Sequence, residues 1–181
     1  MLFNTCCVRE HAEKRVFGNI GALREWKEEI PGRILAVCGC MMQQRQVAEK
    51  LFNRFPYVDL VFGTHMQKKL PELLFEALRG ERMVAVSADD TAVVEGLPAV
   101  RGGGVSSFVN INYGCNNYCT YCIVPYVRGP ERSRAIPDIV KETERIVQGG
   151  GTEVTLLGQN VNSYGSDLVG VDFSDVLAAV N

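Results

Sequence analysis

Three cysteines stand close together in the second half of the chain, at Cys115, Cys119 and Cys122. They follow directly on an apolar run over residues 108–113. Three thiolates on one tight loop suit a cubane 4Fe-4S cluster, whose fourth iron stays open to a small molecule with an amino and a carboxylate group. Zinc is the alternative metal. A structural zinc site closes with a fourth ligand, however, and the two histidines, His11 and His65, lie far back in the sequence.

The remaining cysteines bear on the redox state of the chain. There are seven in all, an odd number, and they fall in three clusters. No apolar stretch approaches the roughly 20 residues that a membrane span needs, and the first residues show no apolar signal-peptide core. We therefore expect a cytosolic, cytoplasmic protein with reduced cysteines, no membrane partner, and metal-ligating or catalytic thiols in place of disulfides.

The composition is that of a globular protein. The chain has 181 residues, of which 46% are hydrophobic and 22% are charged, so it can bury a core. Its net charge is −2, which gives no chain-wide positive field. Any nucleic-acid binding must therefore depend on a local patch or on a segment outside this chain.

The elements that must position the cysteines follow an α/β pattern. In the first eighty residues, apolar runs predict strands and apolar spacings of three and four predict helices. The strands are expected over 1–5, 33–40 and 58–62, and the helices over 16–30, 47–55 and 70–78. Alternation with short links predicts a parallel sheet covered by helices.

A second α/β unit is expected after residue 105. It contains strands over 108–113 and 154–157, a helix over 137–147 and the start of a helix over 174–180. We therefore divide the chain into a domain over 1–80, a linker over 81–105 that includes a possible strand at 83–86, and a second domain over 106–181. Both ends look cut, because two strands do not make a stable parallel sheet, and we expect a fragment of a longer protein.

Several segments resemble one family. Residues 112–129 read Asn-Tyr-Gly-Cys-Asn-Asn-Tyr-Cys-Thr-Tyr-Cys-Ile-Val-Pro-Tyr-Val-Arg-Gly and are followed by Glu131-Arg132-Ser133-Arg134. This run resembles the signature of the radical S-adenosylmethionine (SAM) methylthiotransferases. Residues 4–10 and 61–64 are similar to segments of that family's N-terminal domain. Residues 157–165 resemble the branch that acts on tRNA and not the branch that acts on a ribosomal protein.

The resemblance implies a fold and two clusters. The fold would be an N-terminal parallel-sheet methylthiotransferase domain followed by the start of a radical SAM (β/α) partial barrel. One 4Fe-4S cluster would be held by Cys115, Cys119 and Cys122. The auxiliary 4Fe-4S cluster would be held by Cys6, Cys40 and a cysteine upstream of this chain, so that here the site is one ligand short and the first strand is missing.

The position of Cys6 and Cys40 supports this pair independently. Both follow predicted parallel strands at their carboxyl ends, where open α/β sheets place ligands. Cys7 and Cys38 are the rivals. Cys38 lies one pleat before Cys40 and is expected in the core. Cys7 is interpreted as a packing residue, although an exchange of roles between Cys6 and Cys7 stays open.

Three groups of residues are candidates for the SAM site. Tyr121 matches the position beside the SAM adenine in radical SAM proteins, or it is a core aromatic residue. The amides of Gln159, Asn160 and Asn162 can bond an ammonium and a carboxylate, or they form a polar turn. The guanidinium groups of Arg128 and Arg134, like that of Arg132, suit a phosphate or the SAM carboxylate, or they form salt bridges with Glu131 or Asp138.

The resemblance also implies an activity and partners. It implies methylthiolation at C2 of the isopentenylated adenosine next to the tRNA anticodon, with SAM as cofactor and an electron donor such as a flavodoxin or ferredoxin. Three alternatives stay open. They are a sister enzyme that acts on threonylcarbamoyladenosine tRNA, a non-enzymatic iron–sulfur or zinc module, and an inactive fragment.

Overall fold

The computed structural model describes residues 1–7, 10–87, 93, 95 and 104–181. The chain forms two compact units, Met1–Thr91 and Ala92–Asn181, and each is described by itself. The α/β class predicted from the sequence is confirmed in both units. In the described part of the chain, no helix is long and apolar enough to cross a membrane.

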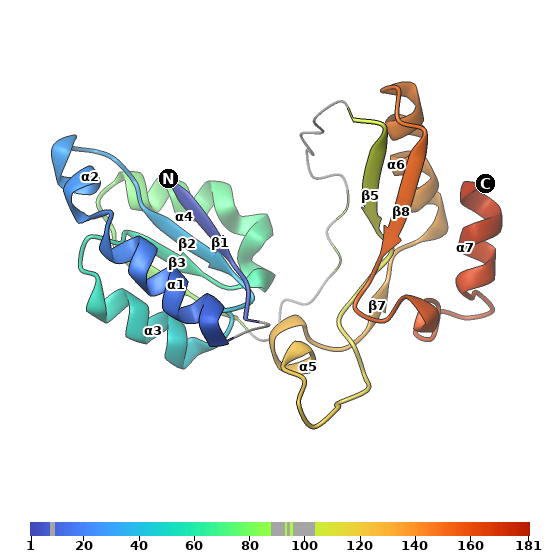
Figure 1. Ribbon diagram of the computed structural model, residues 1–181, viewed down its shortest axis with the longest axis horizontal. Coiled ribbons are helices and arrows are strands. Elements are labelled where there is room, and N and C mark those ends of the chain that lie inside the picture. The colour runs from blue at the N-terminus through green and yellow to red at the C-terminus, as the bar shows by residue number, and fades with distance from the viewer. Residues whose placement is uncertain (8–9, 88–92, 94, 96–103) are drawn as a thin grey trace. The chain divides into compact units, whose positions relative to one another are not determined.

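The first unit is a four-stranded parallel sheet in the order β1-β2-β3-β4 (Figure 1). Its elements, in chain order, are β1 (Leu2–Thr5), α1 (Glu10–Gly21), α2 (Arg24–Glu29), β2 (Ala36–Gly39), α3 (Arg45–Arg54), β3 (Leu60–Phe62), the 3-10 turn η1 (Thr64–Lys69), α4 (Leu70–Leu78) and β4 (Met83–Ala85).

Helices cover both faces of this sheet. On one face, Phe17 and Ile20 of α1 and Leu51 of α3 pack against Val37 and Val61 of the sheet. On the other face, α4 packs against the alternate strand residues, which include Cys38 and Phe62. Successive residues of β2 therefore face opposite layers, as a buried parallel strand requires. The expectation that Cys38 is a core residue is confirmed.

Two details of the first unit differ from the sequence prediction. The helix predicted over 16–30 is two helices, because the chain turns at residues 22–23 after Gly21, and Ile30 is an exposed residue beyond the end of α2. Glycine weakens a helix and commonly ends one. The possible strand at 83–86 is confirmed as β4, but it pairs with β3 and so belongs to the sheet of the first unit and not to the expected linker. Residues 88–92, 94 and 96–103 of the expected linker lie outside the described residues.

The second unit is built around two parallel strands, β5 and β8. Its elements are β5 (Ser106–Asn110), β6 (Asn112–Tyr113), α5 (Val124–Arg128), β7 (Arg132–Ser133), α6 (Ile136–Gln148), β8 (Glu153–Leu157), the 3-10 turn η2 (Val161–Ser163) and α7 (Phe173–Val180). Apolar residues of α6 and α7 pack on one face of the strand pair.

The strand predicted over 108–113 is two strands with different partners. β5 pairs with β8, and β6 then pairs with β7 in an antiparallel ribbon. The change occurs at Ile111, whose amide still bonds Leu157 at 2.8 Å while its carbonyl accepts from the Arg134 amide at 2.9 Å. This ribbon holds the two ends of the cysteine loop together.

Candidate functional site

The cysteine loop runs from Gly114, after β6, to Pro130, before β7, and includes the short helix α5. Gly114, immediately before Cys115, has φ +76, and a Cβ there would lie 2.0 Å from the Pro130 carbonyl oxygen. Only glycine fits this backbone crossing. The Cys115 amide donates to the Gly129 carbonyl at 3.3 Å, so the chain entering the loop lies against the chain leaving it.

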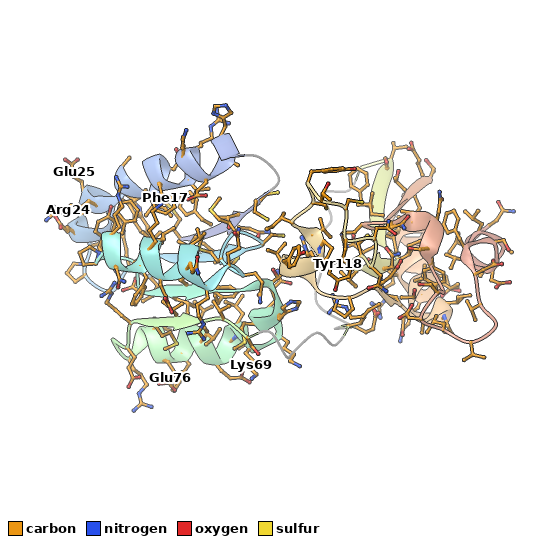
Figure 2. The ribbon with its side chains drawn as sticks, turned by 90° about the horizontal axis from the view of Figure 1, so that it is seen from below. Phe17, Arg24, Glu25, Lys69, Glu76 and Tyr118 are labelled. Carbon is orange, nitrogen blue, oxygen red and sulfur yellow. The ribbon has the colours of Figure 1, made fainter. Side chains whose placement is uncertain are left out.

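The three thiols of this loop differ in exposure. Cys115 is only 8% exposed, Cys122 is half-buried and Cys119 is exposed. The Cys122 amide donates to the Cys119 carbonyl at 2.9 Å, which closes a tight turn between the last two cysteines. Tyr118, labelled in Figure 2, has φ 45 and turns the backbone into the left-handed region just before Cys119.

The donor set fits an iron–sulfur cluster by its chemistry. None of the seven cysteines, all of which are described residues, is in a disulfide, and thiolates are the usual ligands of cluster iron. Among the described residues, no group of three His, Cys, Asp or Glu side chains is gathered as a metal centre. The structure thus brings the three cysteines onto one short loop, while their convergence on a single group remains a prediction.

A polar network lies behind the loop. The Glu131 carboxylate is buried and accepts hydrogen bonds from Asn112 Nδ2 at 3.2 Å and from the Ser163 hydroxyl. Asn112 Nδ2 also donates to the Asn160 carbonyl at 2.7 Å. The network joins β6, the segment after the loop and the segment after β8. Sequence reasoning missed it because its partners are 19 to 48 residues apart, with no spacing signal.

The three candidate amides have different surroundings. Gln159 uses its side-chain oxygen to accept from the Gly114 amide at 2.7 Å. Asn160 contributes its backbone carbonyl to the network, and Asn162 is exposed. The structure therefore brings Gln159 and Asn160 to the base of the cysteine loop.

The arginines divide into two groups. Arg132 donates to the Arg128 carbonyl at 2.6 Å, and burial, with the neighbouring Arg128 charge, lowers the pKa of Arg132. The Arg132 guanidinium is thus bonded to the backbone of Arg128, and the charge of the Arg128 side chain acts on it.

Arg134 is only 6% exposed and forms ion pairs with Glu95 at 2.6 Å and Glu142 at 2.7 Å. Burial alone would lower the pKa of Arg134, but hydrogen bonds to the two carboxylates outweigh it and raise the pKa. Arg134 Nη1 also donates to the Asn110 carbonyl at 2.6 Å. The structure does not support the expectation that Arg134 binds SAM or phosphate, and its carboxylate partners differ from Glu131 and Asp138.

The aromatic residues of the loop are on the surface. Tyr121 is 91% exposed, which excludes the alternative that it is a core residue. Tyr118 and Tyr126 meet edge to face, with ring centroids 5.9 Å apart. Tyr121 thus presents a free ring next to Cys122.

In the first unit, cysteines meet at the carboxyl ends of β1 and β2. The Cys40 amide donates to the Thr5 carbonyl at 3.1 Å, which places Cys40 beside the residues that follow β1. A hydrogen bond between the Cys7 and Cys40 thiols, together with burial and the Cys6 and Cys40 charges, raises the pKa of Cys7. Cys6 is exposed, and Cys7 also packs on the core. The structure thus brings Cys40 next to Cys7 and to Thr5, the residue before Cys6, and the exchange between Cys6 and Cys7 stays open.

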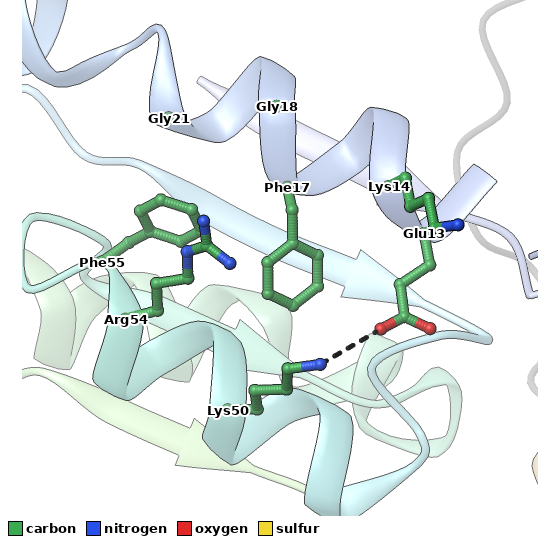
Figure 3. Close-up of a pocket in the computed structure, with 8 residues that line it drawn as sticks. All are labelled: Glu13, Lys14, Phe17, Gly18, Gly21, Lys50, Arg54 and Phe55. Carbon is green, nitrogen blue, oxygen red and sulfur yellow. Dashed lines mark ion pairs between the residues drawn. The ribbon is translucent and has the colours of Figure 1, made fainter. Parts of the chain in front are cut away.

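A separate groove of about 600 Å³ lies between α1 and α3 (Figure 3). Lys50 forms an ion pair with Glu13 across it at 3.8 Å, and Phe17 and Phe55 form its apolar wall. None of the residues that line the groove is a candidate site residue from the sequence. The groove is therefore distinct from the cysteines at the ends of β1 and β2 and from the cysteine loop.

Comparison with known proteins gives two family matches. Residues 1–63 match the family described as "Uncharacterized protein family UPF0004", and residues 109–173 match the Radical SAM superfamily. Three similar curated proteins are each named tRNA-2-methylthio-N(6)-dimethylallyladenosine synthase. They come from Clostridium perfringens (54% identity), Caldicellulosiruptor saccharolyticus (55%) and Clostridium tetani (53%). The chain is therefore similar along its whole length to proteins of the radical SAM methylthiotransferase family.

The alignments with these methylthiotransferases cover the whole chain but only part of each relative. They include 100% of this chain and 41%, 39% and 40% of the three relatives, so the chain spans about two fifths of their length. The Radical SAM match and these similar proteins imply SAM and iron–sulfur clusters as cofactors. The resemblance inferred from residues 4–10, 61–64, 112–134 and 157–165 is thereby confirmed.

Proposed function

We propose that this chain is part of a tRNA methylthiotransferase. The reaction would replace the C2 hydrogen of isopentenylated adenosine, next to the tRNA anticodon, by a methylthio group. The observation that carries the proposal is the identity of 53–55% along the whole chain to proteins named for this activity. Because these names specify dimethylallyladenosine, the sister activity on threonylcarbamoyladenosine is not favoured.

The radical SAM cluster would be held by Cys115, Cys119 and Cys122. This assignment is supported by the free state of the three thiols and by the single loop that carries them. It is also supported by the position of this loop within the Radical SAM match. When bound, such a cluster supplies one-electron reduction of SAM and hence a radical able to attack an unreactive C–H bond. The electron would come from a flavodoxin or ferredoxin.

The chain's own residues would bind and orient SAM beside the loop. The exposed ring of Tyr121 suits contact with the adenine. Asn160 and Asn162 suit the amino-acid end, and the guanidinium of Arg128 suits the carboxylate. Arg134 is left out of this set because its donors are used by Glu95, Glu142 and Asn110.

The auxiliary cluster would take Cys6 and Cys40 from this chain. Their support is their common edge at the carboxyl ends of two neighbouring parallel strands. We further propose that residues 1–80 with β4 form the methylthiotransferase domain and that residues 106–181 form the first part of the radical SAM domain. We also propose that the protein acts in the cytoplasm, on the grounds of its proposed tRNA substrate.

Electron paramagnetic resonance on the anaerobically reconstituted, reduced chain tests the proposal. We expect a 4Fe-4S signal that changes when SAM is added, and its loss in Cys115→Ala. A Cys38→Ala variant is the matched control, because Cys38 is a core residue of the first unit and is not itself a proposed ligand. Uptake of zinc, or a signal indifferent to SAM, would contradict the proposal and favour a metal-binding module.

A further inference from the structure

Three successive residues at the start of the cysteine loop are each held by a hydrogen bond. The Gly114 amide donates to Gln159 Oε1 at 2.7 Å, and the Cys115 amide donates to the Gly129 carbonyl at 3.3 Å. Asn116 accepts from the Glu131 amide through Oδ1 at 3.0 Å. Cys115 is also the most buried thiol of the loop, so it is the most fixed of the three.

Of these contacts, the hydrogen bond to Gln159 is the one that links the loop to the segment after β8. Gln159 lies two residues after the end of β8, and the neighbouring Asn160 carbonyl accepts from Asn112 on β6 at 2.7 Å. The segment after β8 therefore forms hydrogen bonds to two residues that lead into the loop, Asn112 and Gly114. Gly114 has no side chain, and a side chain there would clash with the Pro130 carbonyl. Its backbone amide is therefore the group that can bond to Gln159.

We propose that Gln159 is a positioning residue for Cys115, because it fixes the Gly114 amide and thereby the backbone from which the Cys115 thiol projects. The inference rests on the proposed cluster at Cys115, Cys119 and Cys122. It changes the role expected for Gln159, whose side-chain oxygen is used by the protein backbone and not by SAM.

The test uses two variants of Gln159 in the 181-residue chain. Gln159→Leu keeps the approximate size and removes the acceptor, whereas Gln159→Glu keeps an acceptor oxygen. Gln148→Leu, which alters an exposed amide at the end of α6, is the matched control. The first readout is exchange of the Gly114 amide hydrogen by NMR on the metal-free chain. The second is iron per chain and the resonance spectrum after reconstitution.

We expect Gln159→Leu to speed exchange of the Gly114 amide about fivefold, the factor that corresponds to one hydrogen bond of about 1 kcal/mol. We expect the iron content of Gln159→Leu to fall at least twofold, and we expect Gln159→Glu to have the iron content of the unaltered chain. Unchanged exchange, or faster exchange with unchanged iron content and spectrum, would overturn the positioning role. Full cluster uptake by Cys115→Ala would instead refute the proposed function, whatever Gln159 does.

Discussion

Replacing Gly114 by alanine tests how closely the two ends of the cysteine loop must approach. The new Cβ would lie 2.0 Å from the Pro130 carbonyl oxygen and 2.5 Å from the Gly129 carbonyl oxygen. Ordinary contacts between such atoms are over 3 Å, so the backbone must separate by about 1 Å or more. Cys115, the next residue, would move with it.

The magnitude follows from two separate costs. An alanine at φ +76 has a left-handed backbone, which costs roughly 1–2 kcal/mol. Loss of chain entropy in the unfolded state offsets about 0.4–1 kcal/mol of this. The steric overlap adds about 1–3 kcal/mol, as for other overpacked sites. We therefore expect the free energy of unfolding to fall by roughly 2–4 kcal/mol.

Gly170→Ala is the matched control for this variant. Gly170 lies in the same unit with φ +67, but its added Cβ would meet nothing within 4 Å. It should show the backbone cost alone, about 1 kcal/mol or less. Urea unfolding followed by circular dichroism measures both variants, and iron content after reconstitution should fall only in Gly114→Ala. Equal destabilisation of the two variants would refute the steric argument.

Three further predictions concern the scaffold. Arg134→Leu leaves Glu95 and Glu142 without their cation and should lower the free energy of unfolding by roughly 3–5 kcal/mol in urea titrations; a loss below about 1 kcal/mol would mean that these ion pairs are dispensable. Gly18→Ala adds a Cβ with nothing within 4 Å inside α1 and should stabilise the protein by about 0.5–1 kcal/mol, seen as a higher melting temperature. Burial, together with the charge of nearby Cys40, raises the pKa of Cys38 from 9.0 to about 11, so the thiol should favour the folded state below pH 9 and lose about 2 kcal/mol of this stabilisation between pH 9 and 11. An identical pH profile in Cys38→Ala would contradict that assignment.

The parts of the fold that the sequence predicted are those with a clear apolar period. The buried strands and amphipathic helices of the first unit were found because each has one or two apolar faces. Even the short strand β4 left a signal at residues 83–86. The turn at residues 22–23 was missed because the apolar spacing continues across it, while Gly21 ends the helix locally.

The candidate site was predicted in its residue types but only partly in its contacts. The cysteine spacing identified the loop, and Gly114 lies within the motif at residues 112–129. The partners of Arg134 could not be predicted, because Glu95 and Glu142 are 39 and 8 residues away and other carboxylates are closer in sequence. The bond from Gln159 to Gly114 spans 45 residues and depends on how β8 lies beside β5.

The parallel pairing of β5 with β8 makes the cysteine loop part of a long crossover connection, which occupies residues 111–152. The entropy of closing so long a connection grows only with the logarithm of its length, at about 0.6 kcal/mol for each doubling. A few residues inserted between Cys115 and Cys122 would therefore add less than about 0.1 kcal/mol to this closure cost. The proposed cluster, and not the closure of this connection, would then limit the spacing of the cysteines.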